Sequence, residues 1–162
     1  MLNKKQQMQA LIRRYREQTG QQHVDLKEVA KFATSMGWPL PVPKSPLDRL
    51  AEQFATAARE ETRRDEVTGR PYRANLAVTT WQGKDQMVLW SDIDEAPRHI
   101  VHKALFQRRE QMVGDALQLT FDAMHWNRVN ENQPPIEMPL DLTDDVQWRL
   151  NAPDEDEGER AA

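Results

Sequence analysis

The sequence of 162 residues contains no cysteine. This absence excludes disulfide bonds, thiolate zinc sites and cysteine nucleophiles, and it fits a reducing compartment such as the cytoplasm. No apolar run approaches the ~20 residues that a membrane-spanning helix needs. The N-terminal segment, MLNKKQQMQALIRRYREQTG, lacks the apolar core of a secretory signal. We therefore expect a soluble, cytoplasmic protein with no membrane partner.

Motifs of enzymatic chemistry are also missing. The sequence has no glycine-rich phosphate loop, no nucleophile elbow and no zinc-ligand spacing. One group of side chains could suggest a metal site: Asp92, Asp94, Glu95, His99 and His102. Acidic residues just before a proline are, however, what a helix N-terminus favours electrostatically. We therefore expect no catalytic residue, no metal site and no cofactor, and a protein that is not an enzyme.

The formal net charge of -4 is unevenly distributed along the chain. Residues 1–84 hold 15 Lys and Arg against 9 Asp and Glu, a net of +6. Residues 85–162 hold 7 against 17, a net of -10. Such asymmetry has two explanations. The basic half binds a polyanion while the other half stays acidic, or the basic and acidic halves attract each other within the chain.

The first 64 residues predict three amphipathic helices. Apolar residues recur at helical spacing over residues 3–18, within a basic N-terminal segment 1–20. Asp25 is a good N-cap for a second helix, which Gly37 ends. After a proline-rich connector, Ser45 followed by proline predicts the start of a third helix over roughly 46–64. That helix would carry Arg63 and Arg64 in its last turn.

A β-hairpin is predicted next, because residues 74–81 and 86–91 are rich in Val, Leu, Thr and Trp around the connection Gln82-Gly83-Lys84-Asp85. If a four- or five-residue loop brings Trp81 and Trp90 near each other across the ladder, the two rings form a cross-strand pair. Three helices followed by a hairpin, residues 21–96, are typical of a winged-helix domain. The long connector and the glutamates of the third helix leave an alternative, a mixed domain whose helices only support the hairpin.

Arginines surround the turn that Gly69 and Pro71 predict. Held together at the surface, these guanidiniums would bind phosphates, and Lys84 would add a contact from the tip of the hairpin. Neighbouring acids could instead neutralise each arginine. The candidate nucleic-acid contacts are Gln53, Thr56, Arg59, Arg63, Arg64, Arg70, Arg73 and Lys84.

The longest periodic element is an amphipathic helix within residues 97–130, expected over 97–128. Four of its apolar residues are spaced by seven, which suits a helix–helix seam: Leu105, Met112, Leu119 and Trp126. At ~1.5 Å per residue it would be about 48 Å long, so it either breaks near Gly114 or contacts a partner. Residues 131–150 predict an extended arm and residues 151–162 a disordered acidic tail.

The sequence as a whole predicts a mainly helical α+β protein. Its winged-helix-like core of three helices plus a β-hairpin would precede a long amphipathic helix and a disordered acidic tail. We expect a non-enzymatic, regulatory nucleic-acid-binding protein, with duplex DNA as the target and a possible homodimer through the helix 97–128. The alternative is an adaptor subunit that binds a protein partner through that helix and the acidic half of the chain.

Overall fold

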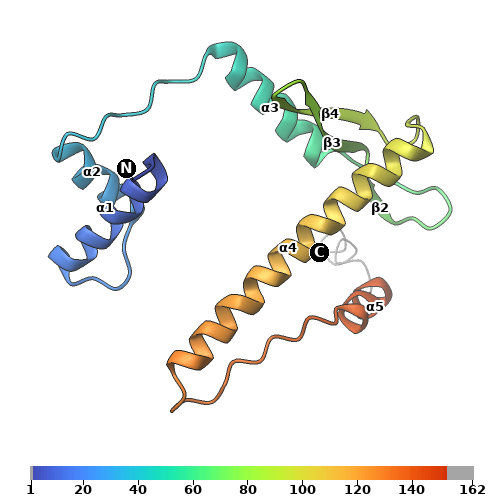
Figure 1. The fold of residues 1–162 in the computed structure, drawn as a ribbon. Coiled ribbons are helices and arrows are strands. Elements are labelled where there is room, and N and C mark those ends of the chain that lie inside the picture. Colours follow the sequence, from blue (N-terminus) through green and yellow to red (C-terminus); the bar gives the residue numbers. More distant parts are fainter. Residues whose placement is uncertain (1, 153–162) are drawn as a thin grey trace, which may run out of the picture. The chain divides into compact units, whose positions relative to one another are not determined.

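The computed structural model describes residues 2–152 and confirms a mainly helical α+β protein. The described residues form five helices and two antiparallel hairpins (Figure 1). They belong to two compact units, one ending at Gln53 and the other beginning at Phe54. The predicted winged-helix domain, residues 21–96, extends across this boundary, so its winged-helix arrangement stays a prediction. None of the helices among residues 2–152 combines the length and the apolar character that crossing a bilayer requires.

The first unit contains α1 (Lys4–Thr19) and α2 (Leu26–Ser35), both close to the predicted bounds. Asn3 and Gln6 form a reciprocal capping box at the start of α1, and Asp25 caps α2 as predicted. The two helices meet through Tyr15 and Phe32, whose ring centroids lie 5.5 Å apart. The helix α3 (Pro46–Glu60) also begins in this unit, where the Ser45 hydroxyl accepts a hydrogen bond from the Asp48 backbone.

The third helix is shorter than predicted and is followed by a hairpin that the sequence did not reveal. Arg63 and Arg64 lie not in a helical turn but in β1 (Thr62–Arg64), which pairs with β2 (Pro71–Arg73). The Asp65 carboxylate organises the connection by accepting hydrogen bonds from the backbone of Val67 and Thr68 and from the Thr68 hydroxyl. Gly69 has φ 71°, a left-handed backbone conformation that residues with a side chain rarely adopt.

The predicted second hairpin is confirmed as β3 (Asn75–Gln82) and β4 (Asp85–Asp92). Gly83 and Lys84 form its two-residue turn, with Gly83 at φ 64°. The predicted tryptophan pair is wrong, because this register places Trp81 opposite Gln86 and Trp90 opposite Ala77. The two rings therefore lie four residues apart along the ladder.

The core of the second unit lies where β3 meets α4 (Arg98–Val129). Leu76, Val78 and Ala104 are buried there, and Ile93, Ile100 and Val101 pack against them. The Gln107 side chain donates to the Thr79 carbonyl at 2.9 Å and accepts from the Thr79 amide at 3.0 Å. Its amide group thus occupies a position on the free edge of β3, where unpaired backbone groups would otherwise need water.

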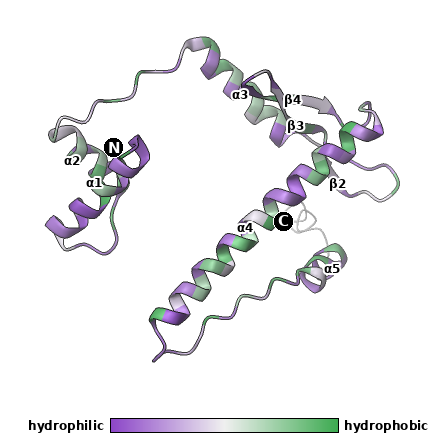
Figure 2. Ribbon diagram, viewed as in Figure 1, coloured by the Kyte–Doolittle hydropathy of each residue, from purple (hydrophilic) through white to green (hydrophobic). Residues whose placement is uncertain are grey.

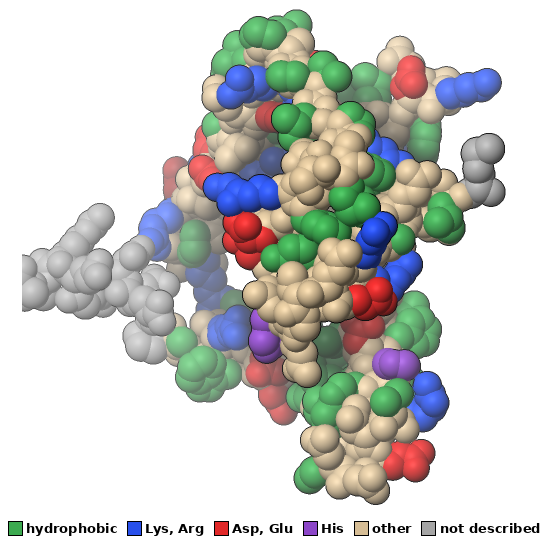
Figure 3. Space-filling view, turned by 90° about the vertical axis from the view of Figure 1, so that its left-hand side faces the viewer, with side chains coloured by type: hydrophobic (Ala, Val, Ile, Leu, Met, Phe, Trp, Pro, Cys, Tyr) green, Lys and Arg blue, Asp and Glu red, His purple; other side chains and the backbone are tan. Residues whose placement is uncertain are grey.

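The long helix is continuous through Gly114, so the first of the two alternatives, a break near Gly114, does not occur. It begins after Pro97 without a side-chain cap hydrogen bond, so the acidic residues that precede Pro97 do not cap it through their side chains. Ala104 is the single buried residue of α4. Hydrophobic residues recur on successive turns of the helix (Figure 2), and hydrophobic side chains lie at the molecular surface among charged ones (Figure 3).

After α4 the chain turns at residues 130–133 and runs back through residues 134–142, which form no helix or strand (Figure 1). The Asn127 side chain holds this segment by donating to the Ile136 carbonyl and accepting from the Ile136 amide. The predicted extended arm to residue 150 is wrong over its second half, where Thr143–Asn151 forms α5. Most of the predicted disordered tail, residues 153–162, lies outside the described residues.

Candidate anion-binding groove

The structure separates the arginines that were predicted to act together. Arg63 forms ion pairs with Asp92 and Asp94, both at 2.7 Å, and with Glu61 at 3.3 Å. Arg64 donates to the Gly69 carbonyl, and Arg70 donates to the Leu150 carbonyl at 2.9 Å. Arg63 is therefore neutralised by its own chain. Glu61 is one of the neighbouring acids that the sequence left open as partners, whereas Asp92 and Asp94 lie 29 and 31 residues away.

The ion pairs of Arg63 join the first hairpin to the end of β4. Hydrogen bonds to Asp92 and then Asp94 raise the pKa of Arg63 far above its ordinary value. The Arg63 guanidinium in turn lowers the pKa of Asp92. Tyr72 donates its hydroxyl hydrogen bond to Asp94 at 3.0 Å, and this bond raises the pKa of Tyr72 because it favours the neutral phenol. These side chains form a structural network in which carboxylates engage both terminal nitrogens of the Arg63 guanidinium.

The lowered pKa of Asp92 predicts a loss of stability in acid. A carboxyl whose folded pKa lies below its unfolded value, about 3.9, stabilises the folded state above that value. The stabilisation is lost as the pH falls through the folded pKa. We expect the free energy of unfolding to decrease below about pH 4, and Asp92→Asn to flatten this decrease while lowering stability at pH 7. Chemical unfolding of both proteins between pH 2.5 and 7 would measure it, and parallel pH profiles would contradict it.

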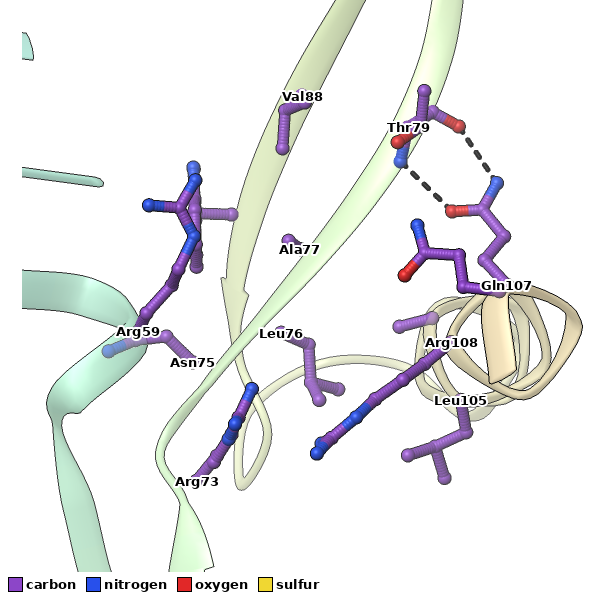
Figure 4. A pocket seen from close by; sticks show the side chains of 13 residues that line it. Arg59, Arg73, Asn75, Leu76, Ala77, Thr79, Val88, Leu105, Gln107 and Arg108 are labelled. Atoms are coloured by element: carbon purple, nitrogen blue, oxygen red, sulfur yellow. Dashed lines mark hydrogen bonds between the residues drawn. The ribbon is translucent and has the colours of Figure 1, made fainter. Parts of the chain in front are cut away.

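A different set of arginines lines one groove in the second unit, with a volume of about 300 Å³ (Figure 4). Arg59 comes from the end of α3, Arg73 from β2 and Arg108 from α4. None of the 13 described residues that line the groove is acidic. We call this groove, with its three lining arginines, the arginine groove.

Two contacts hold the α3 side of the groove in place. The Arg59 guanidinium carbon lies 5.4 Å from the centroid of the Trp90 ring, a cation–π distance. Asn75, at the start of β3, donates to the Ala58 carbonyl at 3.2 Å and to Glu61 at 2.7 Å. The end of α3 is thereby fixed beside the open face of the second hairpin.

Arg73 and Arg108 point toward one another across the groove (Figure 4). Within residues 2–152, no hydrogen bond or ion pair joins either guanidinium to another group. Two like charges that face each other repel unless an anion lies between them. This arrangement favours an anionic ligand, which charge-assisted hydrogen bonds would hold.

The groove contains two of the residues predicted to contact nucleic acid, Arg59 and Arg73, together with Leu105 from the predicted helix seam. The other predicted contacts do not line it: Gln53, Thr56, Arg63, Arg64, Arg70 and Lys84. Sequence reasoning missed Arg108, Trp90 and Gln111. No local motif marks Arg108, because it lies 35 residues from Arg73 and joins it only through the crossing of α4 over β3.

No protein-family model, curated protein or solved structure matches the chain. Within the described part of the chain, no three His, Asp or Glu side chains gather as a metal site. Instead, Asp92 and Asp94 hold Arg63, and His102 stacks on Phe106 at 4.3 Å between ring centroids. The chemistry of the arginine groove is therefore inferred from its own side chains.

Proposed function

We propose that the protein is a non-enzymatic nucleic-acid-binding protein whose arginine groove holds phosphates of the backbone. The observation that carries this proposal is that Arg59, Arg73 and Arg108 line one groove whose lining contains no carboxylate. Guanidinium groups suit phosphate because their planar donors match its oxygens. This site replaces the predicted grip by the arginines around the Gly69 turn.

The groove is suited to positioning a nucleic acid and not to reading its bases. Its polar lining consists of guanidinium, amide and hydroxyl groups, while Arg59 covers the Trp90 ring. Phosphate contacts fix the register of a protein on nucleic acid but carry no sequence information directly. Duplex DNA is our expected target, and regulation our expected role. Three helices precede the hairpins β1–β2 and β3–β4, and three helices followed by a hairpin are typical of a winged-helix domain.

A salt-titrated binding assay on a random-sequence duplex tests this function. Neutralising three phosphates should give a slope of log affinity against log salt of about -2.7, that is, about -0.9 for each phosphate. The same assay on single-stranded DNA, on RNA and on anionic lipid vesicles separates the targets. Absence of duplex binding at low salt, or equal binding to the vesicles, would contradict the proposal.

A second function, as a subunit of an assembly, is favoured by the exposure of α4. The predicted seam includes Met112 and Leu119, which are 56% and 41% exposed. Another face of the helix exposes Val113, Leu117, Phe121 and Met124 to a similar degree. A helix that is apolar on several faces is normally buried. Seven-residue spacing along α4 suits pairing with the same helix of a second copy, and we propose this self-association as the alternative.

A further inference from the structure

We propose that the acidic residues 154–159 of this chain bind its own arginine groove and compete there with nucleic acid. This inference rests on the proposed function, because it assigns a regulator to the same site. The segment belongs to residues 153–162, outside the described part of the chain. The proposal rests on the sequence of this segment, on the place where the described chain ends, and on the chemistry of the groove.

The charges of the two partners are complementary. Residues 154–159 read Asp-Glu-Asp-Glu-Gly-Glu, which are five carboxylates in six residues. The groove presents three guanidiniums and no acidic lining residue. Carboxylates and phosphates accept the same bidentate hydrogen bonds from arginine. An acidic peptide and a nucleic-acid backbone are therefore chemically equivalent competitors for this groove.

The described chain ends close to β2, the strand that supplies Arg73. The Leu150 carbonyl accepts a hydrogen bond from the Arg70 guanidinium at 2.9 Å, and Arg70 precedes Arg73 by three residues, about 10 Å of extended chain. Residue 154 follows Leu150 by four residues, and residue 159 by nine, which can span up to about 30 Å. Because Leu150 contacts Arg70, the chain that follows Leu150 is long enough for the acidic segment to reach the groove.

Because the acidic segment and the groove belong to one chain, even weak binding between them can give high occupancy of the groove. A segment joined to its site by a short flexible linker has an effective concentration on the order of millimolar. A tail that binds the groove with a dissociation constant about two- to ninefold below this concentration occupies it for most of the time. Removing the charges of the tail should then strengthen nucleic-acid binding about three- to tenfold.

The test compares two full-length variants that carry the same change of net charge. In the tail variant all five acids are made neutral: Asp154→Asn, Glu155→Gln, Asp156→Asn, Glu157→Gln and Glu159→Gln. In the control, five exposed acids outside the groove are made neutral: Glu17→Gln, Glu66→Gln, Asp115→Asn, Glu131→Gln and Glu137→Gln. Affinity for a fluorescent random-sequence duplex is measured for both variants and the wild type at one low salt concentration.

We expect the tail variant to bind the duplex three- to tenfold more tightly than the control. A synthetic peptide of residues 153–162 should displace duplex from the tail variant, and adding Arg73→Ala and Arg108→Ala to that variant should abolish its advantage. Equal affinities of tail variant and control would overturn the autoinhibitory contact and leave the proposed function standing. If the tail variant does not bind duplex at all, the proposed function itself fails.

Discussion

Replacing Arg73 and Arg108 together with alanine is expected to weaken duplex binding about a hundredfold at low salt. Hydrogen bonds to charged groups contribute about 1.5 kcal/mol each at the lower end of their range, and about 1.4 kcal/mol corresponds to a factor of ten. The salt slope should become shallower by about 2, because two phosphate contacts are lost. Neither guanidinium forms a hydrogen bond or ion pair within residues 2–152, so the melting temperature should change little.

The matched control removes two arginines from the same helix but not from the groove. Arg98 and Arg128 lie at the two ends of α4, both exposed and both outside the groove lining. The double variant Arg98→Ala and Arg128→Ala loses the same net charge, and its affinity should fall much less. Equal losses in the two double variants would indicate a general charge effect and would contradict a site at the arginine groove.

The second large effect is expected on assembly. If α4 pairs with a second copy through the predicted seam, replacing Met112 and Leu119 with glutamine should convert the assembly to a monomer of 18.9 kDa. Burying each such side chain contributes at least about 1.5 kcal/mol. Four of them per dimer give about 6 kcal/mol, roughly four orders of magnitude in Kd. Size-exclusion chromatography with light scattering measures the mass directly.

The control for assembly changes two polar positions of α4 to the same residue. Asp115 and His125 are both exposed, and Asp115→Gln with His125→Gln should leave the mass of the assembly unchanged. Glutamine is a good helix former, so circular dichroism should show equal helix content in both variants. A wild-type protein that stays monomeric at all concentrations would contradict self-association through α4.

Local chemistry made most elements of this protein predictable. Asp25 and Ser45 predict the starts of α2 and α3, because their side chains accept hydrogen bonds from backbone amides that lack a partner in the first turn of a helix. The apolar periodicity of residues 101–126 predicted α4, and Gly83 allowed the tight turn between β3 and β4. The sequence did not predict the first hairpin, because its strands have three residues each and are too short to show an alternating pattern of apolar and polar residues. The sequence also does not predict helix α5, which lies largely within residues 131–150, the predicted extended arm.

The candidate site was decided by tertiary structure. The sequence by itself determined which arginines exist and that many of them surround the Gly69 turn. Only folding determined that Arg63 would meet Asp92 and Asp94, 29 and 31 residues away, while Arg73 would face Arg108. The reason is physical: these encounters depend on the register of β3 with β4 and on the packing of α4 against β3, which no short-range pattern encodes.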